Sequence, residues 1–141
     1  MVEVLLCLVV GVSDGDTLKA RCNSQTLIIR VAEIDAPEKR QPFGEQSTEH
    51  LASLCLLNEA LITPISRDRH GRTVARVVCQ QQDASEAQLQ QGMAWLYTRY
   101  SKDPTLIPIE EAAQKAGLGL WADPNPTPPW WWRKFRKKAK Q

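Results

Sequence analysis

The sequence predicts an α+β domain, built as a small closed β-barrel of five strands with about three helices. Short segments rich in β-branched and aliphatic residues alternate with turn signals, in the order three strands, one helix, two strands, two helices. A sheet of five short strands exposes two edges unless it closes, so we favour a barrel over the alternative, an open antiparallel sheet with helices on one face. A chain of 141 residues is long enough to bury the core of one such domain.

Five segments carry the strand pattern. The first is apolar and ends at the turn sequence Ser13-Asp14-Gly15-Asp16. In the third, Leu27, Ile29 and Val31 alternate with their neighbours in the period of two that places side chains on opposite faces of a sheet. The predicted strands are residues 2–12, 17–22, 25–34, 61–66 and 73–79.

Helices are predicted between and after the strands. Residues 44–58 place Leu51, Leu54 and Cys55 on one side of a helix. Asp83, followed three residues later by Glu86, has the spacing of a capping box and begins a second helix that Gly92 ends. A third occupies residues 106–116, and the proline-rich residues 124–129 form a linker or wrap. We therefore expect a domain over residues 1–123 and a Pro/Trp-rich, basic tail over residues 124–141.

Charge is unevenly distributed along the chain. The net charge is +2, yet six of the 18 basic residues lie in the last nine positions, which contain no acidic residue. Residues 1–132 therefore carry 12 basic and 16 acidic groups, a net charge of −4. The basic tail has the charge expected of a segment that binds a polyanion. Phosphate binding by residues 1–132 instead requires a few well-placed cations. The alternative is that the basic residues are only solvated and that at least one tail tryptophan packs on the back of the barrel.

Cysteine and histidine content argues against zinc. Cys7, Cys22, Cys55 and Cys79 have no paired spacing of the C-x-x-C type, and the sequence holds two histidines. Two disulfides are possible in three connectivities, and free buried thiols are equally compatible with the sequence. The apolar residues 1–10 lack a basic start and a cleavage site, so we interpret them as a strand. If a signal peptide was removed upstream, a secreted or periplasmic location is favoured over the cytoplasm.

Three clusters carry candidate chemistry: Asp14-Gly15-Asp16-Thr17, Arg30 with Ile34-Asp35-Ala36-Pro37-Glu38, and Asp68-Arg69-His70-Gly71-Arg72. A hard divalent cation takes oxygen ligands such as carboxylates and carbonyls. Guanidinium groups match pairs of phosphate oxygens, and a carboxylate near a water molecule can accept its proton. Taken singly, each cluster also has a purely structural interpretation. The first can be a hairpin turn, the second a loop in which Asp35 caps its own backbone, and the third a loop with a solvated charge at Arg72. Arg30 is the residue that a structural role explains least well, because an unpaired charge is costly within an apolar strand.

Taken together, the three clusters resemble the staphylococcal nuclease (thermonuclease) family, whose fold is a five-stranded OB-fold barrel. The resemblance rests on an Asp-Gly-Asp-Thr hairpin, an Arg on a strand running into Asp-x-Pro-Glu, and an Asp-x-x-Gly-Arg loop, in the same order and at closely similar spacing. Gln91-Gly92-Met93-Ala94 and Gly119-Leu120-Trp121 are similar to later landmarks of the family. The resemblance covers roughly residues 4–123.

The resemblance implies a calcium-dependent endonuclease that hydrolyses DNA and RNA and leaves 3′-phosphate ends. Asp16, Asp35 and the backbone carbonyl of Ala36 would bind one Ca²⁺ ion, while Asp14 would support the hairpin. Glu38 would position or deprotonate the attacking water molecule. The scissile phosphate would be bound by Arg30 and its transition-state charge stabilised by Arg72. We expect a monomer that binds nucleic acid and has no membrane segment in this chain.

Two positions depart from the family pattern. His70 stands where the family often has tyrosine, and Thr98 stands where a base-stacking aromatic residue is expected. Possible substrate contacts are therefore His70, Tyr97 and Tyr100, with packing as the alternative for the two tyrosines.

Two other functions compete with the nuclease: a barrel of the same fold that binds nucleic acid or protein without catalysis, and a plasmid or partition accessory protein that acts by contact alone. Copies of the fold without catalysis usually lack several of the site positions. The first alternative is therefore disfavoured, because this sequence keeps Asp16, Arg30, Asp35, Glu38 and Arg72.

Overall fold

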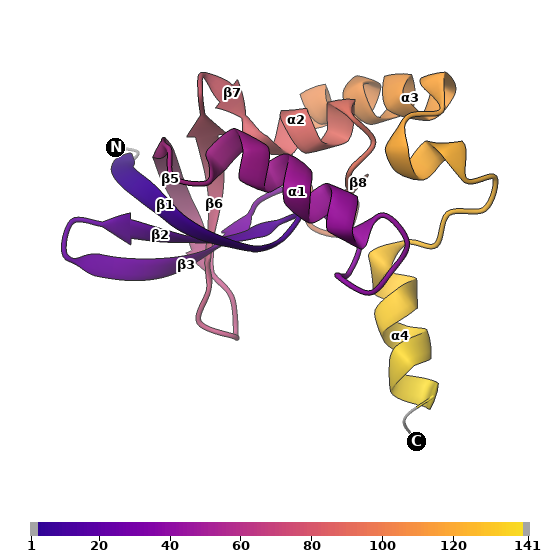
Figure 1. Cartoon of the computed structure of the whole chain (residues 1–141), viewed down its shortest axis with the longest axis horizontal. Coiled ribbons are helices and arrows are strands. Elements are labelled where there is room, and N and C mark those ends of the chain that lie inside the picture. The colour runs from indigo at the N-terminus through magenta and orange to yellow at the C-terminus, as the bar shows by residue number, and fades with distance from the viewer. Residues whose placement is uncertain (1–2, 140–141) are drawn as a thin grey trace.

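The computed structural model describes residues 3–139 and contains a closed barrel that carries helices along one side (Figure 1). The main sheet has the strand order β3-β2-β1-β5-β6-β7, and a parallel pairing of β3 with β6 closes it. A second, two-stranded sheet pairs β4 with β8. The strands are β1 Leu5–Asp14, β2 Thr17–Cys22, β3 Gln25–Val31, β4 Ile34–Asp35, β5 Glu59–Arg67, β6 Thr73–Cys79, β7 Gln82–Asp83 and β8 Trp95–Leu96. The predicted α+β barrel is confirmed.

Alternation along the strands fills the barrel with aliphatic side chains. In β6, every second residue from Thr73 to Cys79 is buried, and β2 and β3 contribute Leu18, Ile29 and Val31 to the same core. Helix α1, Gly44–Cys55, packs Leu51 against this core. The other helices are α2 Ala84–Gln90, α3 Ile107–Ala116 and α4 Pro129–Ala139, with short 3₁₀ segments η1 Pro104–Leu106 and η2 Gly119–Ala122. No helix within the described residues is long and apolar enough to span a membrane.

The predicted third strand, residues 25–34, is wrong in one respect. The chain turns after Val31, where Glu33 has a positive φ of 78°, and resumes as the separate strand β4. Arg30 stabilises this turn because its Nη1 donates to the carbonyls of both Val31 and Ile34, each at 2.8 Å. The break matters for the site, since it directs Asp35 to a second sheet.

Two helix predictions also need correction. The first helix ends at Cys55 rather than at residue 58, because Leu57 adopts a left-handed conformation with φ of 62°. The tail forms a fourth helix, α4, that begins at Pro129, the last residue of the predicted linker. Proline is compatible with the first turn of a helix, where its missing N–H has no partner to lose. The Asp83 cap is confirmed, since its side chain accepts from the backbone N–H of Glu86 at 3.0 Å.

The four cysteines form two disulfides. Cys7–Cys22 joins β1 to β2 across 15 residues, and Cys55–Cys79 joins the end of α1 to β6 across 24 residues. Loops of this size predict a stabilisation of about 3 kcal/mol for each bond, because the cross-link restricts the unfolded chain.

We therefore expect the Cys55→Ala/Cys79→Ala variant to unfold about 10 °C below the native protein. Thermal denaturation followed by circular dichroism measures the midpoint, and the Cys7→Ala/Cys22→Ala variant is the matched comparison. An unchanged midpoint in both variants would show that the bonds do not contribute to stability.

Candidate active site

The site begins at the turn between β1 and β2. Gly15 packs so closely on α1 that an added Cβ would collide with Ser47 Oγ and lie 2.8 Å from Ala36 Cβ. The carbonyl of Gly15 accepts a 2.7 Å hydrogen bond from Nε2 of Gln88, a fully buried side chain of α2 that also donates to the Ser47 carbonyl at 3.0 Å. The Oε1 atom of the same Gln88 amide forms a hydrogen bond with Nδ1 of His50. The turn is thereby fixed against two helices.

Asp16 is buried and charged at this turn. One carboxylate oxygen accepts the backbone N–H of Ala36 at 2.7 Å, and the other accepts Thr17 Oγ1 at 3.0 Å. Burial alone would raise the pKa of Asp16, but the charge of Arg30 and these hydrogen bonds outweigh it and hold the pKa below its ordinary value. Burial and the neighbouring charge of Asp16 raise the pKa of Asp14 to about 7. Of the two carboxyl groups, Asp16 is therefore the more readily ionised.

Arg30 lies between the two predicted cation ligands. Its Nη1 is 3.4 Å from Asp16 Oδ2, and its Nη2 is 3.5 Å from Asp35 Oδ1. Glu33, three residues further along the chain, does not pair with Arg30, because its carboxylate accepts from Ser101 Oγ at 2.6 Å. The charge within the apolar strand is thus compensated by the two carboxylates. Asp16 and Asp35, which are 19 positions apart in sequence, flank one guanidinium.

Asp35 reaches the site from β4. Pairing of Asp35 with Trp95 and of Ile34 with Leu96 holds this strand, and the Asp35 side chain is almost completely buried. Burial, together with the charge of Asp16, raises the pKa of Asp35 although Arg133 and Arg30 lower it. Two buried carboxylates that flank one guanidinium favour the binding of positive charge between them.

Glu38 lies at the rim of the site. Its backbone N–H donates to Gln41 Oε1 at 3.0 Å, and its carbonyl accepts the Gln41 N–H at 2.9 Å, which closes a turn. Gly44, the first residue of α1, lies against the Glu38 carbonyl so closely that an added Cβ would collide with it. The turn and the helix start together fix where the Glu38 carboxylate can reach.

Arg133 of α4 occupies the site, and sequence reasoning missed it. Its Nη2 lies 2.8 Å from Asp35 Oδ2, and its Nη1 lies 3.2 Å from both Asp35 Oδ1 and Glu38 Oε1. Partial burial would lower the pKa of the guanidinium, but the Asp35 carboxylate raises it, so Arg133 stays charged. The only sequence signal was the basic tail itself, which does not reveal that one of its residues contacts two predicted site carboxylates.

Asp68 binds Arg72 through the backbone N–H and the Nε atom of the guanidinium. Asp68 Oδ2 accepts Arg72 Nε at 2.7 Å, and Asp68 Oδ1 accepts the Arg72 backbone N–H at 2.9 Å. In the described part of the chain, no carboxylate pairs with the two terminal amino groups of Arg72. Arg72 precedes β6 by one residue, and Val74 is the register partner of Arg30 in the parallel pairing of β3 with β6. Alternation therefore places Arg72 on the same face of the sheet as Arg30.

The predicted substrate contacts differ in their accessibility. His70 is exposed at the tip of the loop between β5 and β6. Tyr97 has one face covered by Trp130, whose ring is parallel to it with centroids 5.6 Å apart. Tyr100 is 59% exposed and meets Tyr97 edge to face. The packing interpretation thus accounts for the covered face of Tyr97, and Tyr100 keeps an open face.

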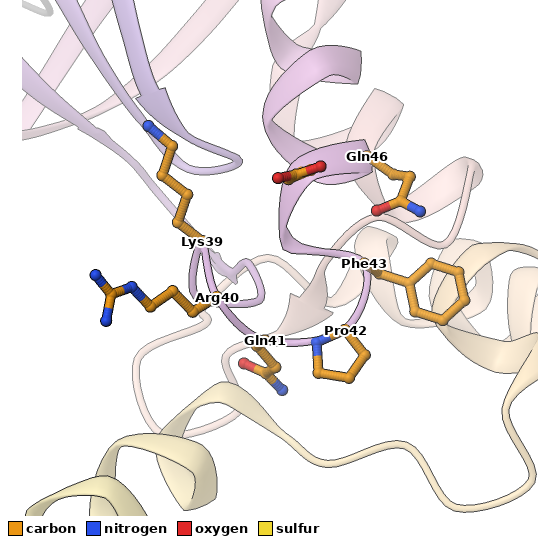
Figure 2. Close-up of a pocket in the computed structure, with 7 residues that line it drawn as sticks. Lys39, Arg40, Gln41, Pro42, Phe43 and Gln46 are labelled. Carbon is orange, nitrogen blue, oxygen red and sulfur yellow. The ribbon is translucent and has the colours of Figure 1, made fainter.

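A separate depression of about 540 Å³ lies on the loop that follows Glu38. Figure 2 shows Lys39 and Arg40 extending from this loop and Gln41 directed toward the segment that leads into α4. Asp16, Arg30 and Asp35 do not line it. The depression adds positive charge beside the site but is not the site itself.

The donor chemistry fits a hard cation, although no three acidic, histidine or cysteine side chains among the described residues form a ready cluster around one point. Asp16 and Asp35 are oxygen donors, both are buried, and both already pair with guanidinium groups. Such a set selects Ca²⁺ or Mg²⁺ over zinc, for which thiolate and imidazole are the usual ligands. All four cysteines are in disulfides and cannot serve as ligands.

Comparison with known proteins shows which family the chain belongs to. The sequence model described as Staphylococcal nuclease homologue matches residues 28–123. The chain belongs to this family. An uncharacterized endonuclease of Haemophilus influenzae is 43% identical over 132 residues, covering 93% of this chain and 74% of that protein. Micrococcal nuclease of Shigella flexneri is 40% identical over 142 residues, covering 93% and 82%.

A further relative, Protein ParB of Escherichia coli, is 36% identical over 137 residues, covering 89% of this chain and 77% of that protein. The family match includes Arg30, Asp35, Glu38 and Arg72. It includes neither the first hairpin nor α4, so Asp16 and Arg133 both lie outside the matched family region.

Proposed function

We propose that this protein is a calcium-dependent endonuclease that hydrolyses phosphodiester bonds in DNA and RNA and leaves 3′-phosphate ends. The observation that carries the proposal is the position of Arg30 between two buried carboxylates, 3.4 Å from Asp16 and 3.5 Å from Asp35. Membership of the staphylococcal nuclease homologue family and the names of the relatives support nuclease activity.

Each site residue then has a role that its surroundings support. Asp16, Asp35 and the carbonyl of Ala36 would hold the Ca²⁺ ion, which when bound supplies positive charge to phosphate oxygens. Glu38 accepts a proton from the attacking water. Arg30 and Arg72 bind the phosphate, whose oxygens gain negative charge as the transition state forms. We also propose that the protein acts as a monomer, because the proposed site needs no residue from a second chain.

A binding module without catalysis is the second candidate. The similarity to Protein ParB supports this candidate, since the name of that relative does not describe a nuclease. The complete set of acidic and basic site residues favours the enzyme. Binding alone does not require a carboxylate such as Glu38, which would repel a phosphate.

Removal of calcium tests the proposal. We expect degradation of both a plasmid and a single-stranded oligonucleotide in millimolar calcium, and loss of degradation in a calcium chelator, because the carboxylates alone repel the phosphate. Gel electrophoresis measures the products. The 3′ ends should resist extension by a polymerase until a phosphatase is added. Asp16→Asn is the matched variant, and activity that persists both in chelator and in that variant would contradict the proposed cation.

A further inference from the structure

We propose that α4 is an autoinhibitory arm, in which Arg133 competes with the proposed cation for Asp35 and Glu38. The inference rests on the proposed function, because it concerns the affinity of the same site for a cation. The guanidinium contacts both Asp35 oxygens, at 2.8 and 3.2 Å, and one Glu38 oxygen at 3.2 Å. An ion that takes Asp35 as a ligand must displace at least part of this contact.

The position of Arg133 follows from how the start of α4 is anchored. Trp130 stacks on Tyr97 with an interplanar angle of 1° and meets Trp95 edge to face at 5.7 Å. Just before the helix, the Thr127 carbonyl accepts a hydrogen bond from the Gln41 side chain. Trp132 helps to line a cavity of about 60 Å³ beside Gln41. These contacts lie one to six residues before Arg133 and direct its side chain into the site.

The arm is suited to leave the site as well as to occupy it. Figure 1 shows α4 (yellow) beside the loop that precedes α1 at its first turn and projecting away from the body at its far end. Its outer side exposes Trp131, Lys134 and Phe135. Buried Trp132 Nε1 has no hydrogen-bond partner within the described residues, and an unsatisfied buried donor lowers the stability of the docked state.

Charge explains why a cation can replace Arg133. Asp16, Asp35 and Glu38 carry three formal negative charges. Within the described body of the domain, Arg30 pairs with Asp16 and Asp35 but not with Glu38, whose ion pair is with Arg133. Arg133 adds one positive charge, whereas a divalent ion adds two in the same place. The docked arm therefore partly neutralises the site when calcium is absent and gives way when calcium is abundant.

Calcium affinity tests the inference without any measurement of cleavage. In isothermal titration calorimetry, we expect Arg133→Gln to bind calcium at least about tenfold more tightly than the native chain, because the fraction of open sites rises. Arg136→Gln removes the same charge from an exposed position of the same helix and should leave the affinity within about twofold. Equal affinities in all three proteins would overturn the inference while leaving the cation site intact. Calcium binding by none of them would instead overturn the proposed function.

Reciprocity provides a second measurement. If Arg133 and calcium exclude each other, calcium must release α4 by the same factor. Because all four cysteines are bonded, Phe135→Cys introduces one free thiol for a fluorescent label on the exposed side of α4. We expect calcium to lower the anisotropy of this label in the native background and to have little effect when Arg133→Gln is also present. Anisotropy that calcium leaves unchanged or raises in the native background would overturn the inference. If Arg133→Gln binds calcium more tightly but loses cleavage, the result supports the competition between Arg133 and calcium. It would also show that Arg133 contacts the substrate.

Discussion

Replacement of Glu38 by glutamine is expected to lower the rate of phosphodiester cleavage by a factor of about 10² to 10⁴. Glutamine has nearly the same shape as glutamate but cannot accept a proton from water at neutral pH. The backbone contacts that fix residue 38, from Gln41 and Gly44, do not involve its carboxylate. The loss should therefore be chemical rather than structural, and the thermal midpoint should change little.

The matched control for this substitution is Glu45→Gln, an exposed residue in the first turn of α1. Both variants remove one carboxylate near the site, so a general effect of charge on substrate binding appears in both. Turnover of a fluorescent single-stranded oligonucleotide at saturating calcium separates them. If Glu38→Gln retains turnover within a factor of two of Glu45→Gln, Glu38 is not the proton acceptor.

Glu38→Gln also weakens one contact of Arg133, because the Glu38 carboxylate is one of its two acidic partners. Inhibition by α4 would then decrease rather than increase in this variant. The loss of the proton acceptor lowers the cleavage rate, whereas a release of α4 would raise it. The two effects of Glu38→Gln on the rate are thus opposite in sign. A measurement at saturating calcium reports the chemical role of Glu38.

The barrel could be predicted from sequence because its signals are local. Alternation predicted that Ile29 and Val31 share one face of the third strand, and both are buried in the core. Asp83 with Glu86 predicted the start of α2. The break in the third strand was missed because it depends on the Arg30 side chain, which binds two backbone carbonyls across the turn. A period of two cannot reveal a hydrogen bond of this kind.

The convergence of Asp16, Arg30 and Asp35 was predicted from the family resemblance rather than from periodicity. Their supporting contacts could not be predicted, because Gln88 lies 73 residues from Gly15 and Arg133 lies 98 residues from Asp35. A glutamine inside a helix and an arginine in a basic tail have no sequence signature of their partner. Such contacts arise only when the helices pack on the barrel.

Replacement of Arg72 by lysine is expected to lower the cleavage rate by about 10² to 10³, although it preserves the charge. Arg72 uses Nε and its backbone N–H to bind Asp68, which leaves the two terminal amino groups of the fork to face a phosphate. Lysine has one ammonium group, whose three N–H donors share a single nitrogen, so it cannot bind Asp68 through one edge and offer a planar pair of donors to the phosphate through the other.

Arg69→Lys is the control for Arg72→Lys, because Arg69 is an exposed arginine of the same loop. Single-turnover cleavage at saturating calcium measures the chemical step, and calcium titration should show that neither variant changes the cation affinity by more than about twofold. Asp68→Asn should give an intermediate loss, since it keeps the fork but removes the charge that orients it. Near-normal single-turnover rates in Arg72→Lys would mean that the fork does not contact the transition state. Arg30 would then be the guanidinium that neutralises the developing charge, which its position between Asp16 and Asp35 permits.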